Sequence, residues 1–306
     1  MHGFRIFAQQ SPAICLGFFL LSMSLPAPIS NAEDYVAATE AWRADRAARL
    51  TSPDGWLSLI GLHWLQAGEN TVGSAKGNFI QFAAGPAHLG KVSLAASGAV
   101  TLAPDGSARL EVDGQLLTGP VNLTYGEGKP SLVREGTISF FVIKRGDKLG
   151  LRVKDTESPR RRHFAGLDWY PVDPAWRIEA SWVPYSPAHE IRITNVLGQT
   201  STMPVPGKAV FAHEGKTYEL MPVDEGETEP LFFILADATS GSETYGASRF
   251  LYAERAKDGK VVLDFNRAQN PPCAFTPFAT CPLPPKENRL PFPVRAGEKN
   301  YPGESH

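Results

Sequence analysis

Residues 262–299 read VLDFNRAQNPPCAFTPFATCPLPPKENRLPFPVRAGEK, and this stretch decides how the chain folds. It holds eight prolines and two of the three cysteines, Cys273 and Cys281. A connection this long without regular structure is usually either functional or disordered. Its aromatic residues and its backbone-fixing prolines argue against disorder. We therefore expect an ordered, extended segment, the C-terminal strap (residues 262–299), lying across the fold.

The composition around the strap is that of an ordinary globular protein. The chain has 306 residues, enough for one or two domains, and 42% of them are hydrophobic, enough for a sizeable core. A net charge of −2 argues against nucleic acid as a partner, because phosphate binding needs a basic excess. The 28 glycines and 26 prolines indicate many turns.

Residues 1–32 have the pattern of a signal peptide. Arg5 precedes an apolar run from Ala13 to Leu25, and Ser30-Asn31-Ala32 provides small residues at a cleavage site. The run is too short to span a membrane. We expect cleavage after Ala32 and a periplasmic or secreted protein with no membrane span.

Export places the two strap cysteines in an oxidising compartment. Cys15 lies in the segment expected to be removed, so a disulfide between Cys273 and Cys281 is the main expectation. Closing this short loop constrains the unfolded chain by about 2.5 kcal/mol. Two alternatives remain open. The thiolates are half of a tetrahedral zinc shell, or they stay free and redox-active. No other cofactor is expected.

Local patterns predict a mainly β protein with one N-terminal helix. Residues 33–50 have helical periodicity and frequent alanine. Short β-like runs follow, and Asp113-Gly114 and residues 145–148 mark hairpin turns between them. This spacing of strands and turns is typical of an antiparallel sandwich. We expect residues 33–154 to form the helix and the β-sandwich.

A break at residues 155–175, dense in Pro, Asp and Gly, separates this part from a second set of β-like runs. WRIEASWVPY and HEIRITNVLG are two such runs, and residues 213–216 and 257–260 are expected turns between later ones. We therefore expect residues 155–306 to form a second antiparallel β region closed by the strap.

Several segments resemble the bacterial family catalogued as domain of unknown function 1684. They are GWLSLIGLHWLQAGENTVGS (55–74), SPRRRHFAGLDWYP (158–171), ADATSGSETYGASRFL (236–251) and most of the strap. The resemblance brings no established activity with it. Residues 60–154 also resemble a forkhead-associated domain. Ser74 stands where that family has Arg, and Asp113-Gly114 replaces its Asn-Gly, so the likeness implies a sandwich and argues against phosphopeptide recognition.

Common catalytic signatures are absent from the sequence. Residues 85–91, GPAHLGK, approach a P-loop, but Val92 follows where Ser or Thr is required, and the next residues have a strand pattern. HExxH, GxSxG, SxxK and a dinucleotide fingerprint do not occur. A catalytic triad assembled from distant positions stays open.

Three polar groups are candidate sites. Residues 160–163, RRRH, are either an anion-binding wall, through Arg160 and His163, or an exposed turn. Residues 237–245 follow the apolar run LFFILA, and seven of the nine side chains can form hydrogen bonds, so they form a network or a site. Arg249 would need a carboxylate partner, for which Asp237, Glu243 and Asp264 are candidates.

The third group ends the last strand, where Asp264, Asn266 and Asn270 either cap turns or form a pocket floor beneath the strap. Our leading hypothesis is a binding protein for a small polar or anionic ligand. Its candidate ligand-binding residues are Arg160, His163, Asp237, Thr239, Ser240, Glu243, Tyr245, Arg249, Asp264, Asn266 and Asn270.

Two alternatives come from different classes of protein. A hydrolase would use Asp237, Glu243 or Asp264 as acid or base, assisted by His163 or Tyr245, and needs a carboxylate and His163 in one open cleft. A structural envelope protein has no ligand site, and its polar cluster would be buried and fully hydrogen-bonded.

Overall fold

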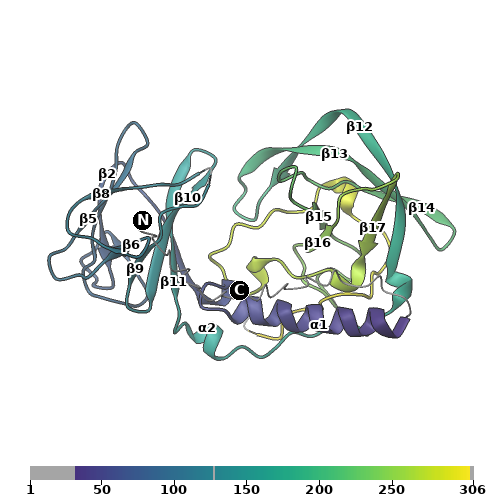
Figure 1. Ribbon diagram of the computed structural model, residues 1–306, viewed down its shortest axis with the longest axis horizontal. Coiled ribbons are helices and arrows are strands. Elements are labelled where there is room, and N and C mark those ends of the chain that lie inside the picture. The colour runs from purple at the N-terminus through teal and green to yellow at the C-terminus, as the bar shows by residue number, and fades with distance from the viewer. Residues whose placement is uncertain (1–31, 127, 304–306) are drawn as a thin grey trace, which may run out of the picture.

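The computed structural model describes residues 32–126 and 128–303. It confirms a mainly β fold with a long N-terminal helix, α1 (Ala32–Thr51), as expected for residues 33–50. Two β bodies lie side by side, and α1 runs along the lower edge of the second (Figure 1). The expected signal peptide lies outside the described residues, except for Ala32.

The first body consists of two sheets packed around one hydrophobic core. Its strands are β1 (Leu59–Trp64), β2 (Gly68–Gly73), β3 (Ile80–Gln81), β4 (Gly90–Leu94), β5 (Val100–Pro104), β6 (Glu111–Val112), β7 (Gln115–Leu116), β8 (Val121–Leu123), β9 (Val133–Glu135), β10 (Ile138–Arg145) and β11 (Lys148–Asp155). The sheet orders are β1-β11-β10-β9-β6-β7 and β3-β2-β4-β5-β8.

The expected hairpin turns of this body are confirmed. Asp113 (φ 51°) and Gly114 (φ 81°) join β6 to β7, and the positive φ at both positions is what a two-residue hairpin turn requires. Arg145 pairs with Lys148 at the β10–β11 turn, where Gly146 also has a positive φ. A short turn, η1 (Trp56–Ser58), precedes this body. Two short connecting segments follow it, the single-turn helix α2 (Pro159–Arg162) and then η2 (Pro174–Trp176).

The second body contains a four-stranded sheet, a two-stranded sheet and the strap. Its strands are β12 (Arg177–Thr194), β13 (Thr200–His213), β14 (Lys216–Leu220), β15 (Leu231–Leu235), β16 (Arg249–Ala253) and β17 (Lys260–Asp264). The orders are β14-β13-β12-β17 and β15-β16. The two runs expected within residues 176–198 are one strand, β12, whose register shifts between Pro184 and His189. Proline cannot donate to the ladder, so the pairing is interrupted there and then resumes.

The strap is ordered and extended, as the sequence predicts. It starts in β17 and continues through three short turns, η3 (Phe265–Arg267), η4 (Pro272–Ala274) and η5 (Lys286–Asn288). Towards its end the side chains alternate, and those that point inward join the core of the second body: Leu290, Phe292, Val294 and Ala296. The strap therefore supplies core side chains without belonging to a long strand.

A buried ion pair anchors the strap. Arg249, which is 0% exposed, donates from Nη2 to Asp237 Oδ2 at 2.6 Å. The same guanidinium donates to the carbonyls of Val294 (2.9 Å) and Ala296 in the strap. Asp237 Oδ1 accepts the backbone N–H of Val294 at 3.1 Å and the hydroxyl of Thr239 at 2.7 Å. Moving the strap away would leave two buried charges without partners.

The helix α1 is held to the second body through polar side chains. Tyr35 donates its hydroxyl proton to Asp264 Oδ1 at 2.6 Å, at the end of β17. Arg46 donates from Nε to Glu298 Oε1 at 3.0 Å and from Nη2 to the carbonyl of Asn270 at 2.9 Å. The helix, the last strand and the strap are thereby tied together.

We expect Arg249→Met to destabilise the protein by about 3–5 kcal/mol, because it leaves Asp237 charged, buried and unpaired. Urea unfolding followed by tryptophan fluorescence measures this. The control is Arg295→Met, since Arg295 binds Glu243 on the exposed surface, and its midpoint should barely move. Equal effects of the two substitutions would contradict the role given to Arg249.

Candidate functional site

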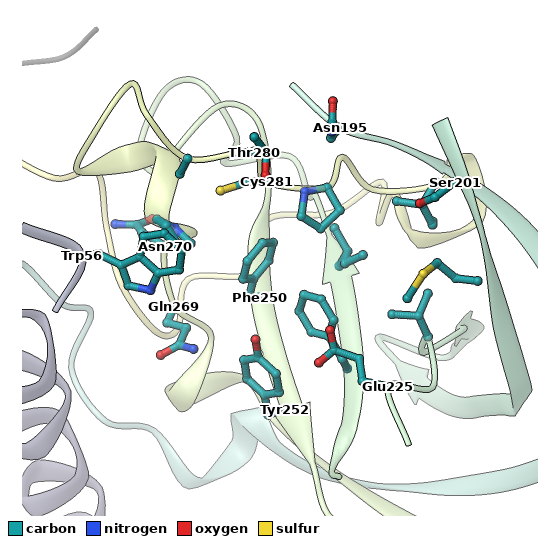
Figure 2. Close-up of a pocket in the computed structure, with 18 of the residues that line it drawn as sticks. Trp56, Asn195, Ser201, Glu225, Phe250, Tyr252, Gln269, Asn270, Thr280 and Cys281 are labelled. Atoms are coloured by element: carbon teal, nitrogen blue, oxygen red, sulfur yellow. The ribbon is translucent and has the colours of Figure 1, made fainter. Parts of the chain in front are cut away.

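A cavity of about 380 Å³ lies between the two bodies, at the lower end of the range for small-molecule sites. Figure 2 shows Phe250 at its centre, with Thr280 and Cys281 of the strap on one side and Tyr252 and Glu225 on the other. Cavities at the junction of two bodies are frequent ligand sites.

The two sides of the cavity differ in chemistry. The second body contributes an apolar floor of six side chains: Ile193, Met203, Val223, Phe232, Ile234 and Phe250. Phe232 and Phe250 meet edge to face, with ring centroids 4.8 Å apart. The first body contributes two cations, Arg145 at the end of β10 and Arg152 within β11.

Arg152 faces the cavity because of strand alternation. Leu149, Leu151 and Val153 of β11 point into the core of the first body, so the residue between the last two points outward. Its neighbours on the adjacent strands are apolar, Leu62 on β1 and Phe141 on β10. The guanidinium lies over the ring of Trp56, 5.0 Å from the centroid.

Arg152 is buried, at 7% exposure, and makes no hydrogen bond or ion pair with any residue that the structure describes. The other buried arginines differ. Arg43 and Arg46 bind a glutamate and a backbone carbonyl, and Arg249 binds Asp237. Burial lowers the pKa of Arg152 to about 10, with the positive charge of Arg145 adding to the effect, so the guanidinium stays protonated at neutral pH.

An unpaired buried cation is unfavourable. Moving such a group out of water costs several kcal/mol unless a counter-charge and hydrogen bonds compensate for the lost hydration. Arg152 is therefore a buried cation of the cavity that lacks a counter-charge among the described residues. Arg145 adds a second positive charge nearby, where its Nε donates to Thr280 Oγ1 at 3.0 Å.

Cys273 and Cys281 lie next to each other, and Cys281 lines the cavity. The backbone N–H of Cys273 donates to Cys281 Sγ at 3.1 Å, and the N–H of Cys281 donates to Cys273 Sγ at 3.3 Å. Both are free thiols in the structure. The hydrogen bond between the thiols lowers the pKa of Cys273 and raises that of Cys281.

The disulfide between Cys273 and Cys281 therefore stays a prediction. The two thiols that would form it lie next to each other. For the zinc alternative, no group of three or more His, Cys, Asp or Glu side chains is placed to hold a metal ion within residues 32–126 and 128–303.

Most of the polar group at residues 237–249 lies in the network beneath the strap. Ser240 Oγ accepts the backbone N–H of Asp237 at 3.1 Å, which adds it to the contacts of Thr239 and Arg249 described above. Glu243 instead accepts three hydrogen bonds from Arg295 and one from the Tyr170 hydroxyl at 3.0 Å. The Arg295 contact holds the pKa of Glu243 below its usual value. Burial raises the pKa of Tyr245 to about 12.

The remaining candidates lie in three other places. Asp264 and Asn266 are beneath α1, where the Asn266 amide donates to the Tyr35 hydroxyl at 2.9 Å. Arg160 and His163 line a separate cavity of about 200 Å³ beside α2. Asn270 lines the cavity that Arg152 faces. In the described part of the chain, His163 and the candidate carboxylates do not converge on one cleft.

Arg152 was missed by the sequence reasoning for a physical reason. An arginine between two apolar residues of a strand normally marks the solvent-facing side of a sheet. The only signal in the sequence is its position in LGLRVKD, between apolar neighbours. Nothing local indicates that a second body covers that side.

Comparisons with known proteins confirm the family resemblance over the second half of the chain. Residues 162–299 match the family described as "Protein of unknown function (DUF1684)". This region includes the strap and the apolar floor of the cavity, whereas Arg145, Arg152 and Trp56 precede it. The resemblance of residues 60–154 to forkhead-associated domains is not confirmed. No curated protein matches the chain.

A solved structure is similar to part of the chain. It is the solution structure of an uncharacterised protein from Haloarcula marismortui, 28% identical, covering 48% of this chain and 83% of its own, with a TM-score of 0.40. Among the helices of the described residues, none is both long and apolar enough to cross a membrane.

Proposed function

We propose that this protein binds a small anionic ligand at Arg152, in the cavity between its two bodies. The observation that carries the proposal is that Arg152 is buried, protonated and without a partner among the described residues. A bound anion supplies the missing counter-charge.

The geometry around Arg152 suits a planar anionic group. The guanidinium contacts the face of the Trp56 ring, with Cζ 5.0 Å from the ring centroid. Its Nε is enclosed and its two terminal nitrogens have no partner among the described residues. A carboxylate or phosphate oxygen pair is the acceptor that matches the N–H groups of a guanidinium.

The same contacts favour binding over the hydrolase alternative. Asp237 is paired with Arg249, and Glu243 with Arg295, so each carboxylate already has a structural partner. Asp264 accepts the Tyr35 proton beneath α1. The structural alternative accounts for the Asp237–Arg249 network, which is buried and hydrogen-bonded. It does not account for Arg152.

Thermal shift with sodium phosphate, citrate and benzoate tests the proposal. At a concentration one hundred times its Kd, a bound anion stabilises the protein by about 2.7 kcal/mol, so the Tm should rise for at least one of them. Arg152→Met should abolish that shift. Without ligand, this variant should be as stable as the wild type or more stable, because it removes an uncompensated buried charge.

Arg192→Met, on the exposed part of β12, is the matched control and should keep the anion response. An unchanged response in Arg152→Met, or no response of the wild type to any of the three anions, would count against binding at this site.

We also propose that residues 1–32 direct export and that Cys273 and Cys281 then form a disulfide. Mass spectrometry of the protein from an envelope fraction should find Glu33 at the N-terminus and the two cysteines in one cross-linked peptide. Replacing both with Ser should lower the Tm by roughly 5–10 °C through loss of about 2.5 kcal/mol. Free thiols in that fraction, or an unchanged Tm, would revive the metal or redox alternatives.

A further inference from the structure

We infer that the ligand of this cavity is an organic monoanion with an apolar body, such as a medium-chain or aromatic carboxylate. This inference rests on the proposed anion binding at Arg152 and specifies what the anion carries. Three features support it. The floor of the cavity is apolar, Arg152 is a buried cation without a partner among the described residues, and some polar lining side chains already form hydrogen bonds.

The floor of the cavity is built from side chains of a hydrophobic core. Five side chains of one buried cluster line it: Ile193, Val223, Phe232, Ile234 and Phe250. Met203 packs against that cluster and also lines the cavity. An inorganic anion at Arg152 would occupy a small part of the 380 Å³ and leave the rest of this apolar-walled space to water. A ligand with an apolar body fills that space, and each methylene it buries there raises the affinity roughly fourfold.

Of the three arginines that line the cavity, Arg152 is the one that is both buried and without a hydrogen-bond partner among the described residues. Arg46 also lines the cavity, but its guanidinium is taken by Glu298 at 3.0 Å and by the Asn270 carbonyl. Arg145 is exposed and bonded to Thr280 and to the Lys144 carbonyl. Arg152 is therefore the cation that most needs a counter-charge.

A carboxylate on the opposite side disfavours a second negative charge. Glu225 lies beside Tyr252, on the side of the cavity away from Thr280 and Cys281 (Figure 2). A dianion long enough to span the floor would bring its second charge towards Glu225, where like charges repel. The site thus distinguishes a monoanion from a dianion of equal length.

Two of the polar lining residues, Asn195 and Thr280, already have hydrogen-bond partners within the protein. The Asn195 side chain bonds to Gln199 and to the backbone of its own turn, at 2.9–3.1 Å. Thr280 Oγ1 accepts from Arg145. A sugar presents many hydroxyls, and those left without partners inside the cavity would each cost free energy.

Isothermal titration calorimetry with the full mature chain tests the inference. The probes are butanoate, hexanoate, adipate, inorganic phosphate and hexanamide. We expect hexanoate to bind roughly tenfold or more tightly than butanoate, from its two extra methylenes. Adipate, in which a second carboxylate replaces the terminal methyl group of hexanoate, should bind at least severalfold more weakly than hexanoate. Hexanamide and phosphate should bind at least tenfold more weakly than hexanoate.

A variant of the floor adds a second measurement. Phe250→Leu keeps an apolar side chain but removes the ring at the centre of the cavity. It should weaken hexanoate binding severalfold and change butanoate binding much less. A larger loss of affinity for hexanoate than for butanoate would support contact between the alkyl chain of the ligand and the floor of the cavity.

The outcomes separate this inference from the function on which it rests. Equal affinities for phosphate, butanoate and hexanoate, all lost in Arg152→Met, would overturn the apolar ligand and leave anion binding intact. Tighter binding of adipate than of hexanoate would overturn the monoanion. Binding of none of these anions overturns both.

Discussion

The buried pair between Arg249 and Asp237 is the interaction on which the rest of this structure depends. Burying two charges is costly, and the cost is offset only when every remaining donor and acceptor finds a partner. Here the partners are backbone groups of the strap, the carbonyls of Val294 and Ala296 and the N–H of Val294. A proline-rich segment with little regular structure is thereby held in one conformation, because its backbone completes the ion pair.

Fixing the strap also builds the cavity. Residues 279–282 of the strap line it, and hydrogen bonds between Cys273 and Cys281 bring together the two ends of the loop that leads into this wall. Two buried arginines, Arg249 and Arg152, differ in the partners that the fold gives them. Arg249 has a carboxylate and two carbonyls, whereas Arg152, almost as deeply buried, has only the face of Trp56. Both terminal nitrogens of Arg249 have partners within the fold, whereas those of Arg152 have none among the described residues.

Much of the framework could be predicted because local chemistry specifies it. Helical spacing identified α1, and Asp113-Gly114 identified a hairpin whose positive φ angles few other residue pairs tolerate. The need of Arg249 for a carboxylate was also predictable, and Asp237 was among the candidates. The sequence left the role of residues 237–249 open between a structural network and a ligand site. Most of the contacts in this group are those of a network that holds the strap.

Local patterns in the sequence specify the mainly β class, the long helix, the tight turns and the ordered strap, since each depends on a few neighbouring residues. The burial of Arg152 in a cavity depends instead on the tertiary structure. Alternation along β11 shows that Arg152 leaves the core of its own sheet, but a solvated surface and a closed cavity look the same in the sequence. Residues 193–282, from the second body, convert that surface into a cavity. The loss of water around Arg152 depends on residues far from it in the sequence, so no local pattern predicts it.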